Sequence, residues 1–367
     1  MKSLEKKEIK INEVLSGLWS KYSFVFVFFL ILILYVITVT ANDNVFSWNH
    51  ISALLASQNT VIVGLIALGM ALVIITGQID LSVGSNLVLT SGAAILVYNV
   101  TDSILLMLIA ALIFGAFCGL INGVLVGYAK MPPFIVTLGT MLIYRSITLS
   151  CVRVFSPEIT GSTSSQFSML RENSTYDFLR LQFGTGNLDI GSFRMPYITM
   201  LFVLILVIVM IISTQTKYGK KVYAIGSNEK ASYLVGININ SMKMSVFVAT
   251  GILVGIASFV QACKIGSVTP ASTAKSYEMY AIAAVVLGGI NMAGGRGNIL
   301  GVFFGTLSYT TINSIIMNIP GLSVDIQDTF QGLVLIVVII IQTIGPVLKE
   351  RFIAFRRQRQ NVSVTKT

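Results

Sequence analysis

The stretch LGGINMAGGRG, residues 287–297, interrupts a long apolar region with five glycines and one arginine. An apolar helix that simply crosses a bilayer needs no such interruption. Helix-breaking residues are tolerated at membrane depth only where the backbone is buried in protein or lines a water-filled cavity. The stretch therefore marks either a place where a membrane fold opens or meets a partner, or a tight turn between two spanning helices.

The composition outside this stretch is that of a polytopic membrane protein. Of the 367 residues, 54% are apolar and 11% are charged, whereas a soluble domain carries about 25% charged residues. The formal net charge of +10 would indicate a nucleic-acid ligand in a soluble protein, but membrane proteins collect lysine and arginine in their cytoplasmic loops. We therefore expect no nucleic-acid partner.

The chain carries no constellation that points to catalysis. Its three cysteines match no disulfide or zinc spacing, and its single histidine leaves little for acid–base chemistry. It also lacks the G-x-x-x-x-G-K-[ST] phosphate-binding loop. We expect no catalytic residue, metal or cofactor, and any ATP hydrolysis would belong to another polypeptide.

Apolar runs of about 20 residues predict ten spanning helices in an all-α fold. The first run follows a basic segment but is too long for a secretory signal peptide, so we expect it to remain uncleaved. The chain then divides into three regions: a cytoplasmic segment at 1–23, one transmembrane domain at 24–346 and a basic tail at 347–367. The predicted helices are 24–41, 58–77, 82–99, 104–128, 134–150, 196–214, 245–262, 279–293, 298–318 and 328–346.

The distribution of charge orients these helices. With both basic termini in the cytoplasm, the ten spans place 18 of the 25 Lys and Arg residues inside and 7 outside. The lysine-rich loop 215–244 is then cytoplasmic and the long segment 151–195 is external. A segment of that length is more often functional than a simple connector, the alternative being a solvated lid over the helices.

Glycine spacing suggests an internal repeat. Small residues four apart let helix backbones approach closely. If helices two to five and seven to ten are structural repeats, the fourth helix corresponds to the ninth, and both are rich in glycine. The second helix enters the membrane from outside and the seventh from inside, so the two repeats would have inverted topology. The glycines are Gly115, Gly119, Gly123 and Gly127 in the fourth helix, and Gly297, Gly301 and Gly305 at the ninth.

A polar segment between the second and third helices carries Asp80 in otherwise apolar surroundings. Intramembrane carboxylates usually face a cavity or a partner, which favours a broken helix beside a transport path. The alternatives are a short cytoplasmic turn with a capping aspartate and, for Asn122, a bond to a neighbouring helix. The candidates for the path or its broken-helix elements are Gln78, Asp80, Ser82, Asn122, Gly288, Gly289, Gly294, Gly295, Arg296 and Gly297.

The external side carries candidates for docking a partner. They are Glu278, at the start of the eighth helix, and Arg171 and Asp177 of the external segment. Helix capping is the alternative for Glu278. Arg145 lies near the outer end of the fifth helix, where we expect it to snorkel to the interface.

The cytoplasmic loop predicts a short helix. Ser227 or Asn228 can cap its N-terminus with Glu229 in the first turn, and Gly236 can stop it. A helix of about two turns is marginal in water, so we expect the loop or a partner protein to hold it; a helix lying at the lipid interface is the alternative. The docking residues assigned are Ser227, Asn228, Glu229, Ala231, Ser232, Leu234 and Gly236, with Tyr233 and Val235 also exposed.

Four motifs, in this order, resemble the sugar-type permease subunits of bacterial ATP-binding-cassette importers, the ribose, galactose, xylose and autoinducer-2 group. One departure is Tyr280, where family members often carry an acidic residue in a Tyr-Glu-x-Asp pattern of which Glu278 is kept. The motifs are TGQIDLSVGS (76–85), PFIVTLGT (133–140), AIGSNEKA (224–231) and AIAAVVLGG (281–289) running on through GGRG (294–297).

The resemblance implies a membrane complex. It implies two permease copies, as a homodimer or heterodimer, around one path in the bacterial inner membrane. It also implies a cytoplasmic ATPase pair that holds ATP and Mg, and a periplasmic or extracellular sugar-binding protein. The loop helix then looks like the coupling helix that seats on the ATPase.

Two other functions stay open at this point. A secondary active sugar transporter would need ion-coupling groups at mid-membrane, for which Asp80 is the one plausible candidate. Within the same family, nucleosides or autoinducer-2 compete with sugars as the solute.

Overall fold

The computed structural model describes residues 2–41, 45–155, 157–161 and 165–319, and six positions between 329 and 340. The chain forms two compact units, Met1–Ile315 and Ile316–Thr367. Apart from those six positions, the predicted tenth span, 328–346, and the basic tail, 347–367, lie outside the described residues. For residues 2–21 only the backbone is described.

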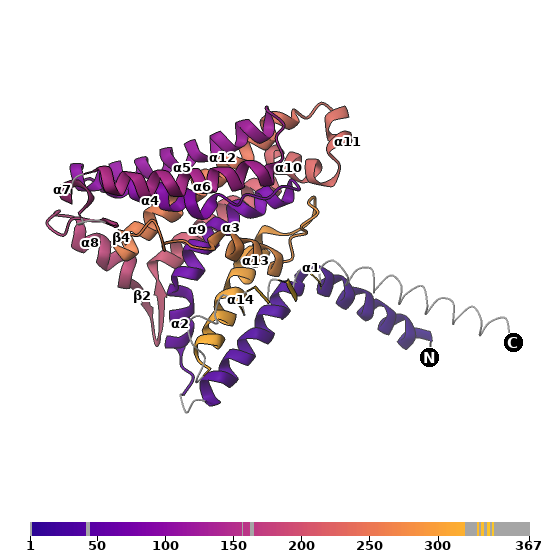
Figure 1. Ribbon diagram of the computed structural model, residues 1–367. Coiled ribbons are helices and arrows are strands. Elements are labelled where there is room, and N and C mark those ends of the chain that lie inside the picture. Colours follow the sequence, from indigo (N-terminus) through magenta and orange to yellow (C-terminus); the bar gives the residue numbers. More distant parts are fainter. Residues whose placement is uncertain are drawn as a thin grey trace. The chain divides into compact units, whose positions relative to one another are not determined.

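Eight helices in the described part of the chain are long and apolar enough to cross a membrane, which confirms a polytopic helical protein. They correspond to eight of the predicted spans, although α12 begins before predicted residue 245. Figure 1 shows their arrangement. The helices are α1 (Lys2–Ala41, kinked at Tyr22 with the span at Tyr22–Ala41), α3 (Gln58–Ile75), α4 (Val83–Thr101), α5 (Ile104–Gly127), α6 (Pro133–Val154), α9 (Tyr197–Gln215), α12 (Ile239–Ile265) and α14 (Ile299–Met317).

The predicted eighth span, 279–293, is shorter in the structure. Helix α13 covers Tyr277–Leu287, 11 residues, or about 16 Å, which cannot cross a hydrocarbon core of about 30 Å. The helix ends at Gly288, and Gly289 adopts a positive φ of 80°. The prediction of a full span was therefore wrong, because the glycine stretch terminates the helix instead of continuing it.

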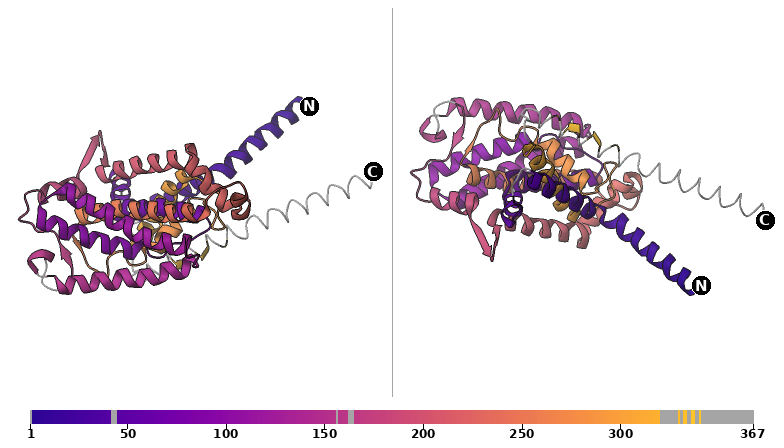
Figure 2. Two further views of the ribbon diagram at one scale, coloured as in Figure 1. Left: turned by 90° about the horizontal axis from the view of Figure 1, so that it is seen from above. Right: turned by 90° about the horizontal axis from the view of Figure 1, so that it is seen from below.

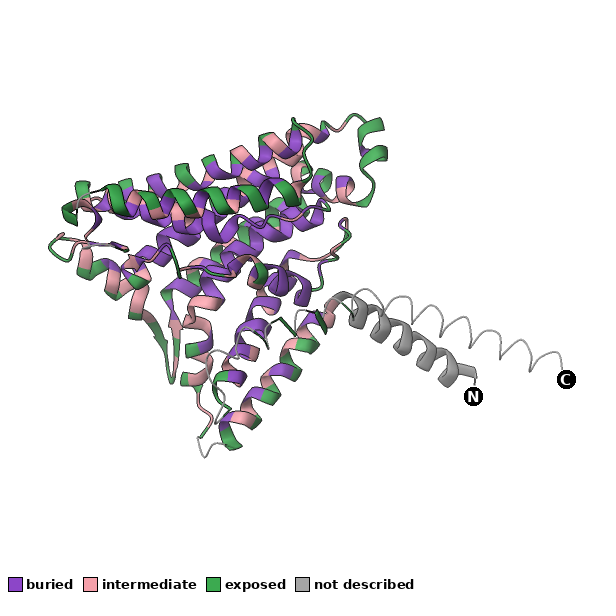
Figure 3. Cartoon of the chain, viewed as in Figure 1, coloured by how far each residue is buried: buried purple, intermediate pink, exposed green. Residues whose placement is uncertain are grey.

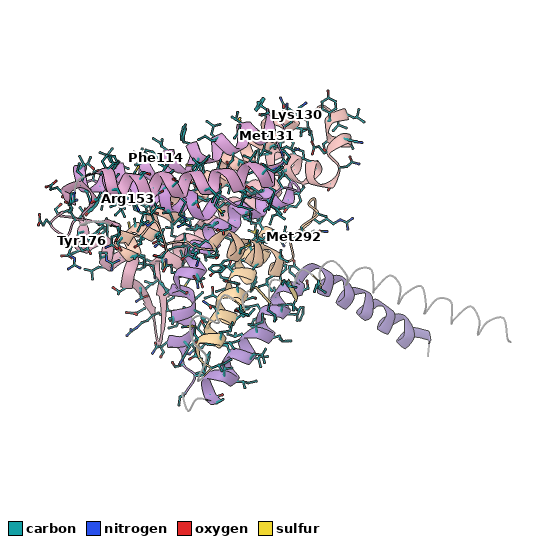
Figure 4. The ribbon with its side chains drawn as sticks, viewed as in Figure 1. Phe114, Lys130, Met131, Arg153, Tyr176 and Met292 are labelled. Carbon is teal, nitrogen blue, oxygen red and sulfur yellow. The ribbon has the colours of Figure 1, made fainter. Side chains whose placement is uncertain are left out.

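The helices divide into a buried core and an outer layer. In the most apolar part of α3, 89% of residues are buried in protein, against 28% in α5. Figure 3 shows the same contrast along the chain. Figure 4 marks Phe114 of α5 and Arg153 of α6, both exposed on outer helix faces. The exposed apolar faces are those expected of helices that contact lipid or another membrane subunit.

Helices α5 and α12 run side by side in close contact (Figure 2). A Cβ atom at Gly115 would overlap the carbonyl oxygen of Gly251, and one at Gly255 would lie 2.5 Å from the carbonyl oxygen of Ala111. The glycine spacing in α5 thus permits close backbone approach, as predicted from the sequence.

Shorter elements connect the spans. Strand β1 pairs antiparallel with β4, with Phe167 opposite Val268, and β2 and β3 form a hairpin. Helix α2 and helix α10 were not predicted, because both are much shorter than a span. The elements are α2 (Trp48–Ala56), α7 (Pro157–Thr160), β1 (Phe167–Ser168), α8 (Tyr176–Arg180), the π-helical turn η1 (Leu181–Thr185), β2 (Asn187–Ile190), β3 (Phe193–Pro196), α10 (Lys217–Ser227), α11 (Glu229–Leu234) and β4 (Ser267–Val268).

Side-chain bonds tie the segment 151–195 to helix ends that the sequence places on the external side. Asn99, in the last turns of α4, donates to the carbonyl oxygens of Ile159 and Ser168 at 2.8 and 2.9 Å. Asp102 accepts from the backbone and hydroxyl of Ser174 at 2.9 and 2.7 Å. These hydrogen bonds hold the pKa of Asp102 below its usual range, so the anchor persists at neutral pH and weakens as the pH falls through that lowered value.

Candidate functional site

Helix α11 forms where the sequence predicted a short helix. The side chain of Asn228 accepts a hydrogen bond from the backbone N–H of Ala231 at 3.0 Å, which confirms it as the N-cap. Gly236 follows the helix with a positive φ of 85°, which confirms the predicted stop. Ser227, the alternative cap, instead ends α10 and donates to the carbonyl of Tyr223 at 2.9 Å.

The outer face of α11 is unusually apolar for an exposed surface. Tyr233, Leu234 and Val235 are 71%, 82% and 78% exposed, as Figure 3 shows by the colour of α11. Ala231 is also exposed, whereas Ser232 is buried. A contiguous set of large apolar side chains on a surface marks an interaction site.

Two neighbouring helices hold α11 in place. The Lys243 ammonium of α12 pairs with the Glu229 carboxylate at 2.9 Å. Helix α10 precedes α11 directly, begins with Thr216 as its N-cap and buries Val222 and Ile225 against the membrane domain. A six-residue helix that would be marginal alone is therefore positioned by its own chain.

The C-terminal end of α10 is packed against the glycine stretch. The backbone N–H of Gly295 donates to the carbonyl oxygen of Ile75 at 2.8 Å. A Cβ atom at Gly226 would overlap that same Ile75 oxygen and would lie 2.5 Å from the Gly295 nitrogen. We call Ile75, Gly226 and Gly295 the glycine junction, because it joins the ends of α3, α10 and the loop before α14 with no side chain between them.

Further bonds support the glycine junction. The Tyr223 hydroxyl donates to the carbonyl oxygen of Gly297 at 3.0 Å, and the Ser227 hydroxyl donates to that of Gly295 at 3.3 Å. Burial raises the pKa of the Tyr223 phenol, so the hydroxyl stays protonated and remains a donor at neutral pH.

The remaining glycines of the stretch have backbone roles. Gly294 has a positive φ of 86° and lies against Gly77, while Gly297 has a φ of 140°. A Cβ atom at Gly288 would lie 2.5 Å from the carbonyl oxygen of Gly301 in α14. Figure 4 shows Met292, at the tip of the same loop. These positions require glycine because of close approach or a left-handed backbone conformation.

The polar candidates near Asp80 come together. The Asp80 carboxylate accepts from the Ser82 backbone N–H and hydroxyl at 2.8 and 2.7 Å, and the Asn122 amide donates to the Ser82 hydroxyl at 2.8 Å. All three residues are buried. Asp80 thus stabilises the turn before α4, and Asn122 links α5 to that turn through its hydrogen bond to Ser82.

Two acceptors at this cluster lack partners. Gln78 Oε1 and Asn122 Oδ1 are buried and, within the described residues, accept no hydrogen bond. A buried polar atom without a partner costs about 1–3 kcal/mol. Such atoms are compatible with a polar ligand or water at this position.

Arg145 does not snorkel, so that expectation was wrong. Its guanidinium donates through Nη1 to the carbonyl oxygens of Pro270 and Thr273 at 2.7 and 2.8 Å. Both carbonyls belong to the segment between β4 and α13, which is not helical. An unwound backbone inside a membrane domain must find its hydrogen bonds elsewhere, and Arg145 supplies two of them.

Replacing Arg145 with alanine is expected to lower the free energy of unfolding by about 3 kcal/mol, because two carbonyls lose a charged donor. Thermal melting of the detergent-solubilised chain measures this change. Arg153→Ala is the matched control, since Arg153 lies exposed on the same helix. Equal melting temperatures for the two variants would contradict the anchoring role of Arg145.

The docking candidates lie apart in the structure. Arg171 and Asp177 are exposed on the external segment. Glu278 is half-buried, with its carboxylate 2.8 Å from the position a Cβ atom would take at Gly84 of α4. The starts of α4 and α13 therefore face each other.

Tyr280, the residue that departs from the family pattern, packs against two other tyrosines. Its ring lies 5.8 Å from that of Tyr277 and 5.2 Å from that of Tyr309. An aromatic cluster therefore joins α13 to α14 at Tyr280. No spacing pattern predicts this cluster, because the three tyrosines come from two separate helices.

Comparison with known proteins identifies the family. A model described as "Branched-chain amino acid transport system / permease component" matches residues 52–339, well over half of the chain. The chain belongs to this permease family. It is a multi-pass membrane permease component of a transport system, and the transport role expected from the motifs is confirmed.

Individual relatives of the permease are named as sugar importers. The ribose import permease protein RbsC of Bacillus subtilis (strain 168) is 36% identical over 280 residues, covering 76% of this chain and 80% of the relative. The fructose import permease protein FrcC of Rhizobium meliloti is 35% identical over 253 residues, covering 68% and 66%. The galactose/methyl galactoside import permease protein MglC of Escherichia coli (strain K12) is 31% identical over 261 residues, covering 68% and 74%. No solved structure matches the chain.

Proposed function

We propose that this permease imports a monosaccharide or a related small polar solute across a bacterial inner membrane. A separate cytoplasmic ATPase supplies the energy, and an external binding protein delivers the solute. The sugar permeases among its relatives support the substrate class. The absence of a phosphate-binding loop from the sequence supports a separate ATPase.

The exposed face of α11 carries this proposal. A short helix that exposes Tyr233 and Leu234, followed by the exposed C-cap residue Val235, fits a hydrophobic groove of another protein. The salt bridge between Glu229 and Lys243 fixes the orientation of α11 on the membrane domain. Helix α11 is therefore the proposed coupling helix, which seats on the ATPase.

The glycine junction is the proposed route by which motion of α11 reaches the membrane helices. When ATP draws the ATPase pair together, the coupling helices follow. Helix α10 then moves the end of α3 and the loop before α14, because Gly226, Ile75 and Gly295 are in direct backbone contact. Close-packed elements transmit such shifts as rigid bodies.

The proposed solute path runs beside the starts of α4 and α13. Gln78 and Asn122 offer buried acceptors for the hydroxyl groups of a sugar. The non-helical segment before α13 is the kind of backbone found at membrane depth beside a path. Asp80 supports the path by fixing Ser82 and the start of α4.

The complete architecture proposed has nine full spans and the half-length helix α13, together with inverted repeats and both termini in the cytoplasm. The non-helical segment before α13 and the glycine stretch after it complete its crossing of the membrane in this proposal. Helices α4 and α13 hold equivalent places in the two repeats, and each follows a non-helical polar segment. Helices α5 and α14 also correspond, and glycines bring each into close contact with a neighbour, α12 and α13. Inverted repeats commonly place such broken helices at the substrate path.

A second permease copy and an external binding protein complete the proposed assembly. The exposed apolar faces of α5 and α6 offer surface to a second copy. Arg171 and Asp177, on the exposed external segment, are proposed to dock the binding protein, and Glu278, at the start of α13, lies apart from them.

A cysteine introduced at Lys230 is expected to react only with thiol reagents that reach the cytoplasm, since Lys230 is exposed in the first turn of α11. Labelling of intact cells with a membrane-impermeant maleimide, before and after lysis, measures this. The background is Cys151→Ser, because Cys118 and Cys263 are buried. Asp177→Cys is the control expected to react from outside. Reaction of residue 230 in intact cells would overturn the orientation.

Affinity purification of the chain from its host, followed by mass spectrometry, tests the proposed function. Recovery of an ATPase with a phosphate-binding loop and of a secreted binding protein is the expected result. The ligand of that binding protein then separates a monosaccharide from a nucleoside, autoinducer-2 or a branched-chain amino acid. Recovery of the chain alone, together with ion-dependent uptake, would favour a secondary active sugar transporter.

A further inference from the structure

A large cavity opens between α1, α9, α10 and the glycine stretch. Its volume is about 1030 Å³. Its walls combine Tyr22 and Phe24 at the kink of α1, Met210 and Thr214 of α9, and Asn298 before α14. Gln78, Asp80, Ser82 and Asn122 do not line it, whereas four other candidates from the sequence do, namely Gly288, Gly289, Arg296 and Gly297.

The charge of the cavity is positive. Lys220 of α10 and Arg296 of the glycine stretch both line it, and none of the described side chains that line it is an Asp or a Glu. The two ion pairs found among the described residues involve other cations, Arg194 and Lys243. Neither the Lys220 ammonium nor the Arg296 guanidinium therefore has a carboxylate partner in the part of the chain that the structure describes.

The flanks of the cavity are apolar and exposed. Phe29 and Leu30 follow the kink on α1, and Ile208 and Ile211 lie near the end of α9, each at least 43% exposed. These side chains belong to helices that cross the membrane. The cavity is thus lined by the two cationic side chains, Lys220 and Arg296, and the exposed apolar surfaces of α1 and α9 lie beside it.

We propose that the cavity binds the phosphate headgroup of an anionic phospholipid from the cytoplasmic leaflet. Lys220 and Arg296 supply two charged donor groups that can converge on one phosphate, and guanidinium groups suit phosphate oxygens geometrically. Basic pockets between membrane helices on the cytoplasmic side are typical sites for such headgroups. The acyl chains lie along the exposed surfaces of α1 and α9.

The bound lipid would stabilise the contact between α10 and the glycine stretch, next to the proposed coupling helix α11. Lys220 belongs to α10, which carries the glycine junction and leads directly into α11. Arg296 is the residue after Gly295 of that junction. A headgroup bound by both cations links the two segments from the membrane side. The inference rests on the proposed orientation, with α10 on the cytoplasmic side.

The test is the retention of phosphatidylglycerol by the full-length chain in phosphatidylcholine nanodiscs, counted by native mass spectrometry. We expect Lys220→Gln to weaken retention about fivefold, and Lys220→Gln with Arg296→Gln about 30-fold, at about 1 kcal/mol per lost cation. Arg296→Lys should keep most of the binding. Lys221→Gln is the control, because Lys221 is exposed on the same helix but does not line the cavity.

Two results would overturn the proposal. One is equal retention of phosphatidylglycerol by the wild type and the Lys220→Gln variant, with equal melting temperatures. The other is saturable binding of inorganic phosphate that displaces phosphatidylglycerol, which would make this a site for a soluble anion. Neither measurement needs an ATPase, a solute or a fixed orientation in the disc, so its failure is separable from failure of the proposed transport function.

Discussion

Replacing Gly226 with alanine is expected to abolish most solute uptake and to lower the free energy of unfolding by about 3 kcal/mol. The added methyl group would overlap the carbonyl oxygen of Ile75, and the backbone of Gly295 lies on the same side. Neither neighbour is a flexible side-chain end, so α10 must move away from α3. The hydrogen bond from the Gly295 N–H to Ile75 would then lengthen or break.

Uptake of radiolabelled solute by proteoliposomes and thermal melting in detergent measure the two parts of this prediction. Gly139→Ala is the matched control, because Gly139 also lies in a helix and a Cβ atom there would meet nothing within 4 Å. That control should be neutral or stabilising by up to about 1 kcal/mol, since alanine favours helices. Normal uptake and normal melting of Gly226→Ala would remove the glycine junction from the coupling route.

Leu234→Arg is expected to release the ATPase while leaving the fold intact. The Leu234 side chain is 82% exposed, so arginine there adds little cost to folding. In a partner groove, however, it would replace a buried apolar anchor with a charge, and loss of one central anchor commonly costs at least about 2 kcal/mol of binding. We expect ATPase recovery and uptake to fall about 30-fold or more.

Co-purification of the ATPase with the tagged permease measures this effect, with melting temperature as the check on folding. Leu188→Arg is the matched control, because Leu188 is an exposed leucine on the β2–β3 hairpin, on the opposite predicted side. The double variant Glu229→Arg with Leu234→Arg should lose coupling completely, since it also breaks the salt bridge to Lys243. Full transport by that double variant would refute the coupling-helix proposal.

Local patterns were enough to predict the elements whose formation depends on nearby residues. Apolar runs predicted the eight described spans, because a helix that crosses a bilayer needs about 20 consecutive, mostly apolar residues, and such a run is visible in the sequence. Asn228 and Gly236 predicted the bounds of α11, because caps act within one helical turn. The glycine row of α5 predicted close packing, although not that α12 is its partner.

Predictions that depended on distant residues were less accurate. Arg145 was expected at the interface, and only the fold shows that it reaches the carbonyls of Pro270 and Thr273. The eighth span ended early at Gly288 and Gly289, and only the fold shows that Gly288 also packs closely against Gly301 of α14. Helix α10 was missed because its 11 residues are too few for a span, and only the fold shows that Val222 and Ile225 are buried.

The sequence by itself determined that this is a multi-span membrane protein, where most of its spanning helices lie and where its short cytoplasmic-loop helix begins and ends, because hydropathy and capping are local properties. Only the tertiary structure decided that Gly226, Ile75 and Gly295 meet at one junction. It also placed Lys220 and Arg296 around one cavity. These arrangements depend on backbone contacts and charges from segments far apart in the chain, and such contacts exist only once the helices have packed together.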